Sequence, residues 1–329
     1  MGFVYDDEGK VVGNDDTFVA QKVKDLWDVD EEVTEPEVVK RKVFRDPEAS
    51  AAMPLFRTLS LDELENLPDP EWIVDGVIPA DAMVTVFGAP GSTKSFFALD
   101  IACSIAAGEA FNEANVNKGK VIYCVGEGLR GMKWRIEAWK LAHPNADYEA
   151  LNENLIILPR AVMLLDKTES AMLVNTAEAI NEETPLRAFV IDTWARSLTG
   201  GDENSAQDVG VAINICETVR AKTKASPIII HHTGADGTRE RGSTALRGAT
   251  DTTIQMAHEE TSGMVTVTCK KMKDGEPFPV MRFNLKPFGH SIVLSPTASN
   301  YGGTGTYTPP TRDKNYYINK AAEKKDFPF

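Results

Sequence analysis

The sequence is poor in cysteine and has no long hydrophobic run. Its 329 residues include four cysteines, which are Cys103, Cys124, Cys216 and Cys269. None has the C-x-x-C spacing of a zinc or redox site, so we expect small buried side chains in a reducing compartment. No apolar stretch reaches the roughly 18 residues of a membrane span, and the N-terminus lacks the basic and apolar segments of a signal peptide. We therefore expect a cytoplasmic protein without a membrane partner.

Basic residues are also scarce. The chain has 35 Lys and Arg against 49 Asp and Glu, a net charge of −14, and residues 1–70 alone hold 18 acidic and 8 basic side chains. This balance argues against a broad basic surface for nucleic acid but leaves room for a local basic channel. Residues 1–70 are poorly periodic, which predicts an acidic, flexible or lightly folded extension with short helical patches near Asp16–Trp27 and Ser60–Leu67. Such an extension is either solubilising only or a docking segment for other proteins.

The pattern of residues 71–297 predicts one α/β domain. Apolar, β-branched runs alternate with helical segments such as 129–143 and 205–222, which is typical of a parallel sheet with helices on both faces. The predicted buried strands are Met83–Phe87, Val121–Val125, Leu155–Leu158, Ala188–Asp192 and Pro227–His232.

The pattern changes after Thr250. Four short alternating segments predict an antiparallel extension of the same sheet. They are Thr252–Ala257, Met264–Lys271, Val280–Leu285 and Ser291–Leu294. Residues 298–329 are rich in Gly, Thr, Pro, Lys and Tyr, so we expect a disordered or partner-dependent tail.

The segment Gly88–Ser95 joins a predicted strand to a predicted helix. It matches the phosphate-loop pattern G-x-x-x-x-G-K-[ST], except that Thr93 replaces the glycine before the lysine. In such a loop, backbone N–H groups face the phosphates, the Lys94 ammonium reaches the β- and γ-phosphates, and the Ser95 hydroxyl ligates Mg²⁺. The residues expected to hold ATP are Gly88, Ala89, Pro90, Gly91, Ser92, Thr93, Lys94, Ser95 and Phe96.

Two points about this loop stay open. A β-branched residue is poorly suited to a positive φ, so either Thr93 keeps a negative φ or the loop is slightly remodelled. The alternative to a phosphate loop is a chance turn ahead of a core helix, which the strand–loop–helix context disfavours.

Two carboxylates follow predicted strands. Asp192 ends an apolar strand and is a candidate Mg²⁺ carboxylate at the ligand crevice of an open α/β sheet. Glu127 lies between Gly126 and Gly128 just after another strand and is a candidate to position and polarise the attacking water. The alternatives are an ordinary strand-ending acid and a helix N-cap acid.

Basic side chains complete the candidate set. His231 and His232 end a strand and point to opposite faces, so we expect one of them to sense the γ-phosphate rather than both to bind one ion. The loop after them carries further candidates for phosphate or DNA contact, Arg239, Arg241 and Arg247, unless it is simply a solvated charged loop. At a predicted hairpin tip, Lys271 and Lys273 either reach a nucleotide on a neighbouring subunit or are merely exposed.

These stretches together resemble the RecA-like ATPase core of hexameric helicases, and most closely the RepA-like group of plasmids and phages. The resemblance covers residues 72–287 and rests on Trp72–Pro79, Gly88–Ser95, Tyr123–Gly128, Val190–Ser205, His231–Gly234, Arg241–Arg247 and Lys271–Gly275.

The resemblance implies a P-loop NTPase in the cytoplasm of a bacterial host that hydrolyses ATP with Mg²⁺ at the subunit interfaces of a hexameric ring. It implies Glu127 as general base, Asp192 as metal carboxylate and His232 as sensor. It also implies that the loops after Leu198 and Thr233 grip single-stranded DNA. Lys271 and Lys273 correspond to the family's finger pair, although lysine replaces arginine at the second position.

Two other functions stay open. One is a RecA/RadA-type recombination or repair ATPase that forms filaments on DNA. The other is a nucleotide-gated DNA-binding or loading protein that hardly hydrolyses ATP, which Thr93 favours and Glu127 opposes. The last residues, Asp326–Phe329, resemble the tip of bacterial single-stranded-DNA-binding proteins, which docks replication partners; a frayed end is the alternative.

Overall fold

A computed structural model of the chain describes residues 3–5, 11–14, 58–67, 69–234 and 239–297. It divides into two compact units, Met1–Leu67 and Pro68–Phe329. The first contains the antiparallel pair β1 (Phe3–Tyr5) and β2 (Val11–Asn14), and α2 (Leu61–Glu65). Helix α2 lies in the predicted patch 60–67 and begins with a capping box between Ser60 and Glu63. The patch 16–27 and the tail 298–329 lie outside the described residues, and the boundary near residue 70 stays a prediction.

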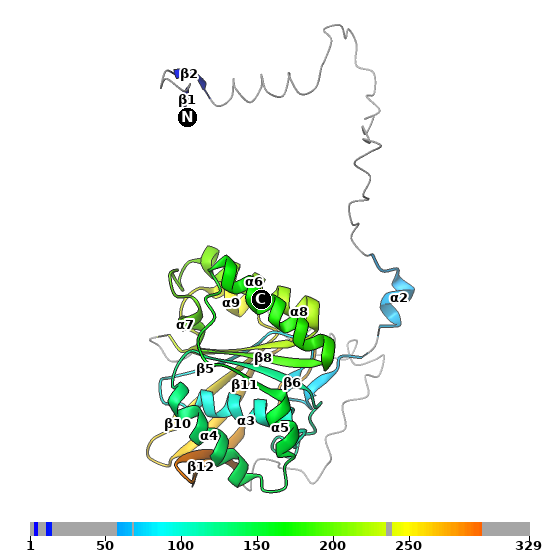
Figure 1. Cartoon of the computed structure of the whole chain (residues 1–329), viewed down its shortest axis with the longest axis vertical. Coiled ribbons are helices and arrows are strands. Elements are labelled where there is room, and N and C mark those ends of the chain that lie inside the picture. The colour runs from blue at the N-terminus through cyan, green and yellow to red at the C-terminus, as the bar shows by residue number, and fades with distance from the viewer. Residues whose placement is uncertain (1–2, 6–10, 15–57, 68, 235–238, 298–329) are drawn as a thin grey trace, which may run out of the picture. The chain divides into compact units, whose positions relative to one another are not determined.

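The second unit is built on a nine-stranded sheet in the order β13-β12-β11-β10-β5-β9-β8-β6-β7 (Figure 1). Its parallel strands are β5 (Val84–Gly88), β6 (Lys120–Val125), β7 (Leu155–Leu158), β8 (Leu186–Asp192), β9 (Ser226–His232) and β10 (Thr252–Glu259). The antiparallel strands are β11 (Met264–Met272), β12 (Met281–Phe288) and β13 (Ser291–Pro296). The predicted fold class, a mostly parallel α/β sheet with an antiparallel C-terminal extension, is confirmed.

The position of β10 corrects the predicted topology. The sequence pattern placed it in the antiparallel extension, but β10 pairs in parallel with β5, so the antiparallel part begins at β11. The physical reason is the crossover helix α9 (Thr244–Ala249), which returns the chain to the start of β5. There, the backbone N–H groups of Asp251 and Thr252 donate to the carbonyl of Met83.

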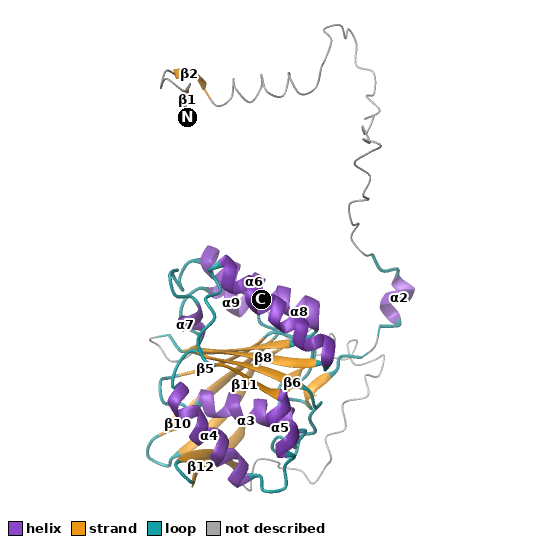
Figure 2. Cartoon of the chain, viewed as in Figure 1, coloured by secondary structure: helices purple, strands orange, loops and turns teal. Residues whose placement is uncertain are grey.

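Helices cover both faces of the sheet (Figure 2). On one face lie α3 (Lys94–Ala107), α4 (Leu129–Ala142) and α5 (Tyr148–Asn154). On the other lie α6 (Lys167–Glu183), α8 (Ala206–Thr223) and α9. A single turn, α7 (Trp194–Ser197), follows β8, and a small hairpin pairs β3 (Trp72–Val74) with β4 (Ile78–Pro79). The patterns at 129–143 and 205–222 correctly predicted α4 and α8. Within the described ranges, no helix is long and apolar enough to cross a membrane.

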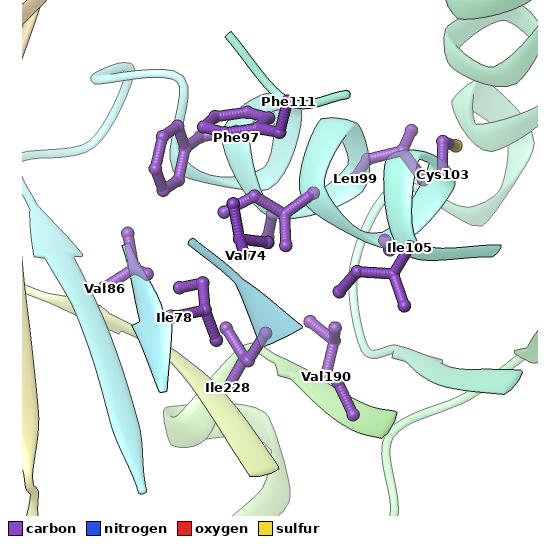
Figure 3. Close-up of a cluster of buried hydrophobic side chains, with 14 of the residues drawn as sticks. Val74, Ile78, Val86, Phe97, Leu99, Cys103, Ile105, Phe111, Val190 and Ile228 are labelled. Carbon is purple, nitrogen blue, oxygen red and sulfur yellow. The ribbon is translucent and has the colours of Figure 1, made fainter. Parts of the chain in front are cut away.

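Helix α3 is buried on almost every side (Figure 3). Its apolar side chains pack on β5, β8 and β9 and on the hairpin residues Val74 and Ile78. The Phe97 ring meets the Phe111 ring edge-on at 5.6 Å between centroids. Because this packing fixes the helix axis, it also fixes the first turn of α3, which follows the predicted phosphate loop.

The predicted environment of the cysteines is largely confirmed. Cys103, Cys124 and Cys216 are buried free thiols, and Cys269 is half-buried. In the part of the chain that the structure describes, no group of three or more His, Cys, Asp or Glu side chains is arranged to hold a metal ion.

Candidate nucleotide-binding site

Four parallel strands end at the same edge of the sheet and bring the predicted site together. Gly88 ends β5 and is the register partner of His232 at the end of β9. Val125 ends β6 and pairs with Asp192 at the end of β8. Glu127 follows two residues after β6. The carboxyl edge of a parallel sheet is where open α/β folds bind ligands, and here it gathers residues from four separate parts of the sequence.

The loop begins at a position that only glycine can occupy. A Cβ atom on Gly88 would lie 2.3 Å from the carbonyl oxygen of Met256 in β10 and 2.5 Å from the Ser92 hydroxyl. The next residues, Ala89, Pro90 and Gly91, are exposed. The loop therefore turns away from the sheet immediately after β5 and presents its backbone to solvent, as a phosphate cradle requires.

Thr93 adopts the left-handed conformation, with φ 64° and ψ 21°, and is the N-cap of α3. Of the two alternatives for this residue, a negative φ is therefore excluded. The residue takes a conformation that glycine reaches without steric cost, and its hydroxyl donates to the Ser92 carbonyl at 2.7 Å. Helix packing behind the loop overrides the intrinsic preference of this β-branched residue.

Replacing Thr93 with glycine should therefore raise the free energy of unfolding by about 1 kcal/mol, because glycine pays no steric cost at this φ. Chemical denaturation measures the change. Thr218→Gly, in the middle of α8, is the matched control and should destabilise the protein, since glycine is unfavourable inside a helix. Equal destabilisation by both substitutions would show that position 93 carries no strain.

Lys94 is buried and faces the loop. Its ammonium donates to the carbonyls of Gly88 at 3.0 Å and Ala89 at 2.9 Å. Burial lowers its pKa to about 8, while the negative charges of Asp192 and Glu127 act in the opposite direction. A triphosphate in this loop would compete with these carbonyls for the ammonium.

Asp192 offers a buried carboxylate with one uncommitted oxygen. The residue is 3% exposed; Oδ2 accepts from the Tyr123 hydroxyl at 2.9 Å, and Oδ1 has no hydrogen-bond partner among the residues that the structure describes. Burial raises the pKa of this carboxyl, whereas Ser95, Tyr123 and the charge of Arg135 lower it. A buried carboxylate oxygen without a partner, beside the Ser95 hydroxyl, fits Mg²⁺, which binds few protein oxygens and keeps water and phosphate as its other ligands.

Glu127 projects from the turn between β6 and α4. Gly128 has φ 70° and is the N-cap of α4, so the chain reverses next to the carboxylate. The Glu127 side chain is 49% exposed and accepts from Arg196 Nε at 2.9 Å. The expected water-positioning carboxylate thus lies at the open side of the same edge, where its charge interacts with Lys94.

The two histidines have separate environments. His231 is buried, and its Nε2 lies 2.7 Å from the Arg241 carbonyl. His232 is half-buried, and its pKa is lowered by burial and by the positive charge of Lys94. The electrostatic interaction of His232 with Lys94 is consistent with His232 as the predicted γ-phosphate sensor, while His231 anchors the following loop.

His231 gives folding stability a defined pH dependence. Burial lowers its pKa from 6.5 to about 4, so between these values the unfolded chain binds a proton that the folded chain does not. The contribution of His231 to the free energy of unfolding is therefore fully present above pH 6.5. It is lost as the pH falls to 4, which lowers the free energy of unfolding by about 3 kcal/mol. Denaturation across this range should show a shallower pH dependence for His231→Gln. Parallel curves for the two proteins would contradict this.

The predicted finger lysines lie away from the phosphate loop. Lys271 is opposite Thr253, near the start of β10, and its ammonium donates to the carbonyls of Thr250 and Arg247. Lys273 forms an ion pair with Asp251 at 3.3 Å. The single chain thus does not bring these groups to Lys94, and their action on a neighbouring subunit's nucleotide stays a prediction.

The three arginines predicted to contact phosphate or DNA have different surroundings. Arg241 forms a two-point ion pair with Glu203, through Nε at 2.5 Å and Nη2 at 2.9 Å. Arg247 is exposed in the last turn of α9, and Arg239 is exposed beside residues 235–238, which lie outside the described part.

Three site residues escaped the sequence analysis. Tyr123 bonds Asp192 from β6, Arg196 bonds Glu127 from α7, and the Arg135 guanidinium lies 4.7 Å from the centre of the Phe96 ring. A fully buried tyrosine needs a hydrogen-bond partner, so the tyrosine within the apolar strand at position 123 could have been predicted to bond a polar side chain. The two arginines carried no such signal, because their partners, Phe96 in α3 and Glu127 after β6, lie in distant parts of the sequence.

The family of the chain follows from residues 48–238, which match the model of the family AAA_25, described as an AAA domain. This match covers more than half of the sequence. The chain belongs to this AAA domain family. The AAA domain is a P-loop NTPase with a RecA-like core, which supports nucleotide binding, usually with Mg²⁺, and ATPase activity in general. No curated protein matches the chain.

Proposed function

We propose that this AAA domain protein is a ring-forming DNA helicase or translocase of the RepA-like type, which hydrolyses ATP at subunit interfaces and holds single-stranded DNA in a central pore. One observation carries the proposal. The loops that follow β8 and β9 leave the sheet from the same edge as the nucleotide site and are bound to each other. A nucleic acid that contacts these loops is thereby connected to the residues that face ATP.

The connection between the loops is tight. Besides the two-point pair between Arg241 and Glu203, the Ser243 N–H donates to the Glu203 carbonyl at 2.8 Å. A Cβ on Gly242 would lie 2.5 Å from that carbonyl, and Gly242 has φ 84°. Arg241 in turn offers its own carbonyl to His231 at the end of β9. The segments 198–205 and 239–243 therefore act as one unit, which we call the paired loops.

The site residues divide the chemistry among them. Lys94 and the N–H groups of the loop bind the β- and γ-phosphates, and Glu127 orients the attacking water. The water oxygen bonds to the γ-phosphorus, the bond to the β,γ-bridging oxygen breaks, and Glu127 accepts the proton that the water loses. Ser95 and Asp192 would hold Mg²⁺, which would neutralise charge on the phosphates. In the proposed cycle His232 senses loss of the γ-phosphate, because it interacts with the charge of Lys94.

The proposed partners are single-stranded DNA and further copies of this chain. Arg241 is paired with Glu203, so a DNA phosphate must displace a carboxylate to reach it. Arg239 and Arg247 are further proposed phosphate contacts. In the proposed ring, Lys271 and Lys273 exchange their contacts within the chain for phosphates of the neighbouring subunit's ATP.

The proposal predicts opposite effects of the two halves of the ion pair on DNA binding. Glu203→Gln releases Arg241 and should tighten binding of a fluorescent single strand about fivefold at low salt. Arg241→Gln should weaken binding and lower the slope of log Kd against log salt concentration by about 1. Fluorescence anisotropy measures both, and Lys222→Gln, which removes an ion pair at the far end of α8, is the control.

Unwinding of a forked duplex tests the whole proposal. We expect strand separation with ATP and Mg²⁺, none with Lys94→Ala, and rings in electron micrographs. Filaments on DNA would favour a RecA/RadA-type ATPase instead. DNA binding that depends on nucleotide but proceeds without turnover would favour a loading protein.

A further inference from the structure

The ion pair between Arg196 and Glu127 has a role that ATP binding alone does not require. We infer that Arg196 is a positioning residue, which holds the Glu127 carboxylate in the orientation that activates water and links it to the paired loops. This inference rests on the proposed role of Glu127. It adds a residue to which the proposed chemistry assigns no contact with phosphate or Mg²⁺.

Arg196 projects from a turn that is firmly anchored. Its neighbours Trp194, Ser197 and Leu198 are all at most 3% exposed, and the Leu164 N–H donates to the Ser197 carbonyl at 2.9 Å. The guanidinium therefore starts from a backbone that the core fixes, although the Arg196 side chain is itself 61% exposed.

The end of β6 lies directly against this turn. The Gly126 N–H donates to the Asp192 carbonyl at 2.5 Å. A Cβ on Gly126 would lie 2.8 Å from that carbonyl and 3.1 Å from the Arg196 Cβ. Glycine at position 126 thus permits the close approach that places Arg196 within reach of Glu127.

Glu127 needs an external restraint. It lies between two glycines on an exposed turn, and Arg196 is the hydrogen-bond donor that the described residues provide to its carboxylate. An exposed ion pair contributes little to folding, so stability does not explain the contact. A fixed donor does restrict the directions that the carboxylate can take, and catalysis depends strongly on that orientation.

The same segment reaches the paired loops. The Arg196 carbonyl accepts from the Thr199 hydroxyl at 2.8 Å, and seven residues after Arg196 lies Glu203, which is held by Arg241. A DNA phosphate that binds Arg241 breaks the ion pair of Glu203, at the end of the segment 196–203. Arg196, at the start of the same segment, positions Glu127. Stimulation of hydrolysis by single-stranded DNA should therefore depend on Arg196.

A double-mutant cycle on the full-length protein tests the inference. We expect Arg196→Gln to lower kcat for ATP by about ten- to a hundredfold, with KM changed by no more than about twofold. Arg196→Lys should restore part of the rate and of the DNA stimulation, because a lysine retains the charge without the planar donor geometry. In the Glu127→Gln background, Arg196→Gln should have no further effect on kcat. Lys222→Gln, which breaks an ion pair of similar exposure, should leave kcat unchanged.

The outcomes separate this inference from the proposed function. Wild-type kcat in Arg196→Gln, with Glu127→Gln inactive, would overturn the inference alone. An equal fold-loss from Arg196→Gln in both backgrounds would also overturn it, because Arg196 would then act independently of Glu127. Wild-type hydrolysis by Glu127→Gln would instead refute the proposed role of Glu127. If Arg196→Gln does not fold, the kcat of Arg196→Lys, compared in the same two backgrounds, decides the question.

Discussion

Lys94→Ala should abolish ATP hydrolysis and weaken binding of Mg-ATP about a hundredfold, because the triphosphate loses a charge-assisted donor in a buried position. Fluorescent-nucleotide titration and a phosphate-release assay measure the two effects. Thermal unfolding of the nucleotide-free variant is the control. It should change little, since burial disfavours the charged ammonium in the free protein and lowers its pKa to about 8. Wild-type turnover without this lysine would remove the basis of the site assignment.

The lowered pKa of Lys94 adds a measurable signature. Phosphate charges favour the protonated amine, so at pH 8 nucleotide binding should be accompanied by proton uptake. Calorimetry in buffers of different ionisation enthalpy detects this uptake, and Lys94→Ala should lack it.

Glu127→Gln should retain ATP binding and lose turnover by about a hundred- to ten-thousandfold, because glutamine has the shape of glutamate but cannot accept the proton of the attacking water. The comparison with Lys94→Ala is informative, since that variant loses binding as well. Glu178→Gln, which removes an exposed carboxylate from the pair with Lys222, is the control and should hydrolyse ATP normally. Hydrolysis at the normal rate by Glu127→Gln would assign the base to another residue.

Much of the fold was predictable because its strands are buried on both faces. The uninterrupted apolar runs around Ile122, Val190 and Ile229 identify central parallel strands, and the polar residue after each run then marks the ligand edge. In this way the grouping of the phosphate loop, Glu127 and Asp192 could be predicted from single positions in the sequence.

Other features depend on contacts that a sequence pattern does not contain. The parallel direction of β10 is determined by the crossover through α9, and its alternating pattern fits either direction. Thr93 has a positive φ because the packing of α3 fixes the loop. The Arg196–Glu127 pair joins α7 to the turn after β6, and the two residues are 69 positions apart in the sequence. Helix α6 was missed although Asp166 caps its N-terminus, because its apolar residues are diluted by polar ones.

Because β10 pairs with β5, a fragment that folds on its own must extend at least to the end of β10. The family match ends at residue 238, before β10 begins, yet β10 supplies the carbonyl against which Gly88 turns. A fragment cut at that limit would leave the strand that carries the phosphate loop as an open sheet edge. Its unpaired backbone groups would favour self-association. The C-terminal strands are therefore required for the structure of the phosphate loop.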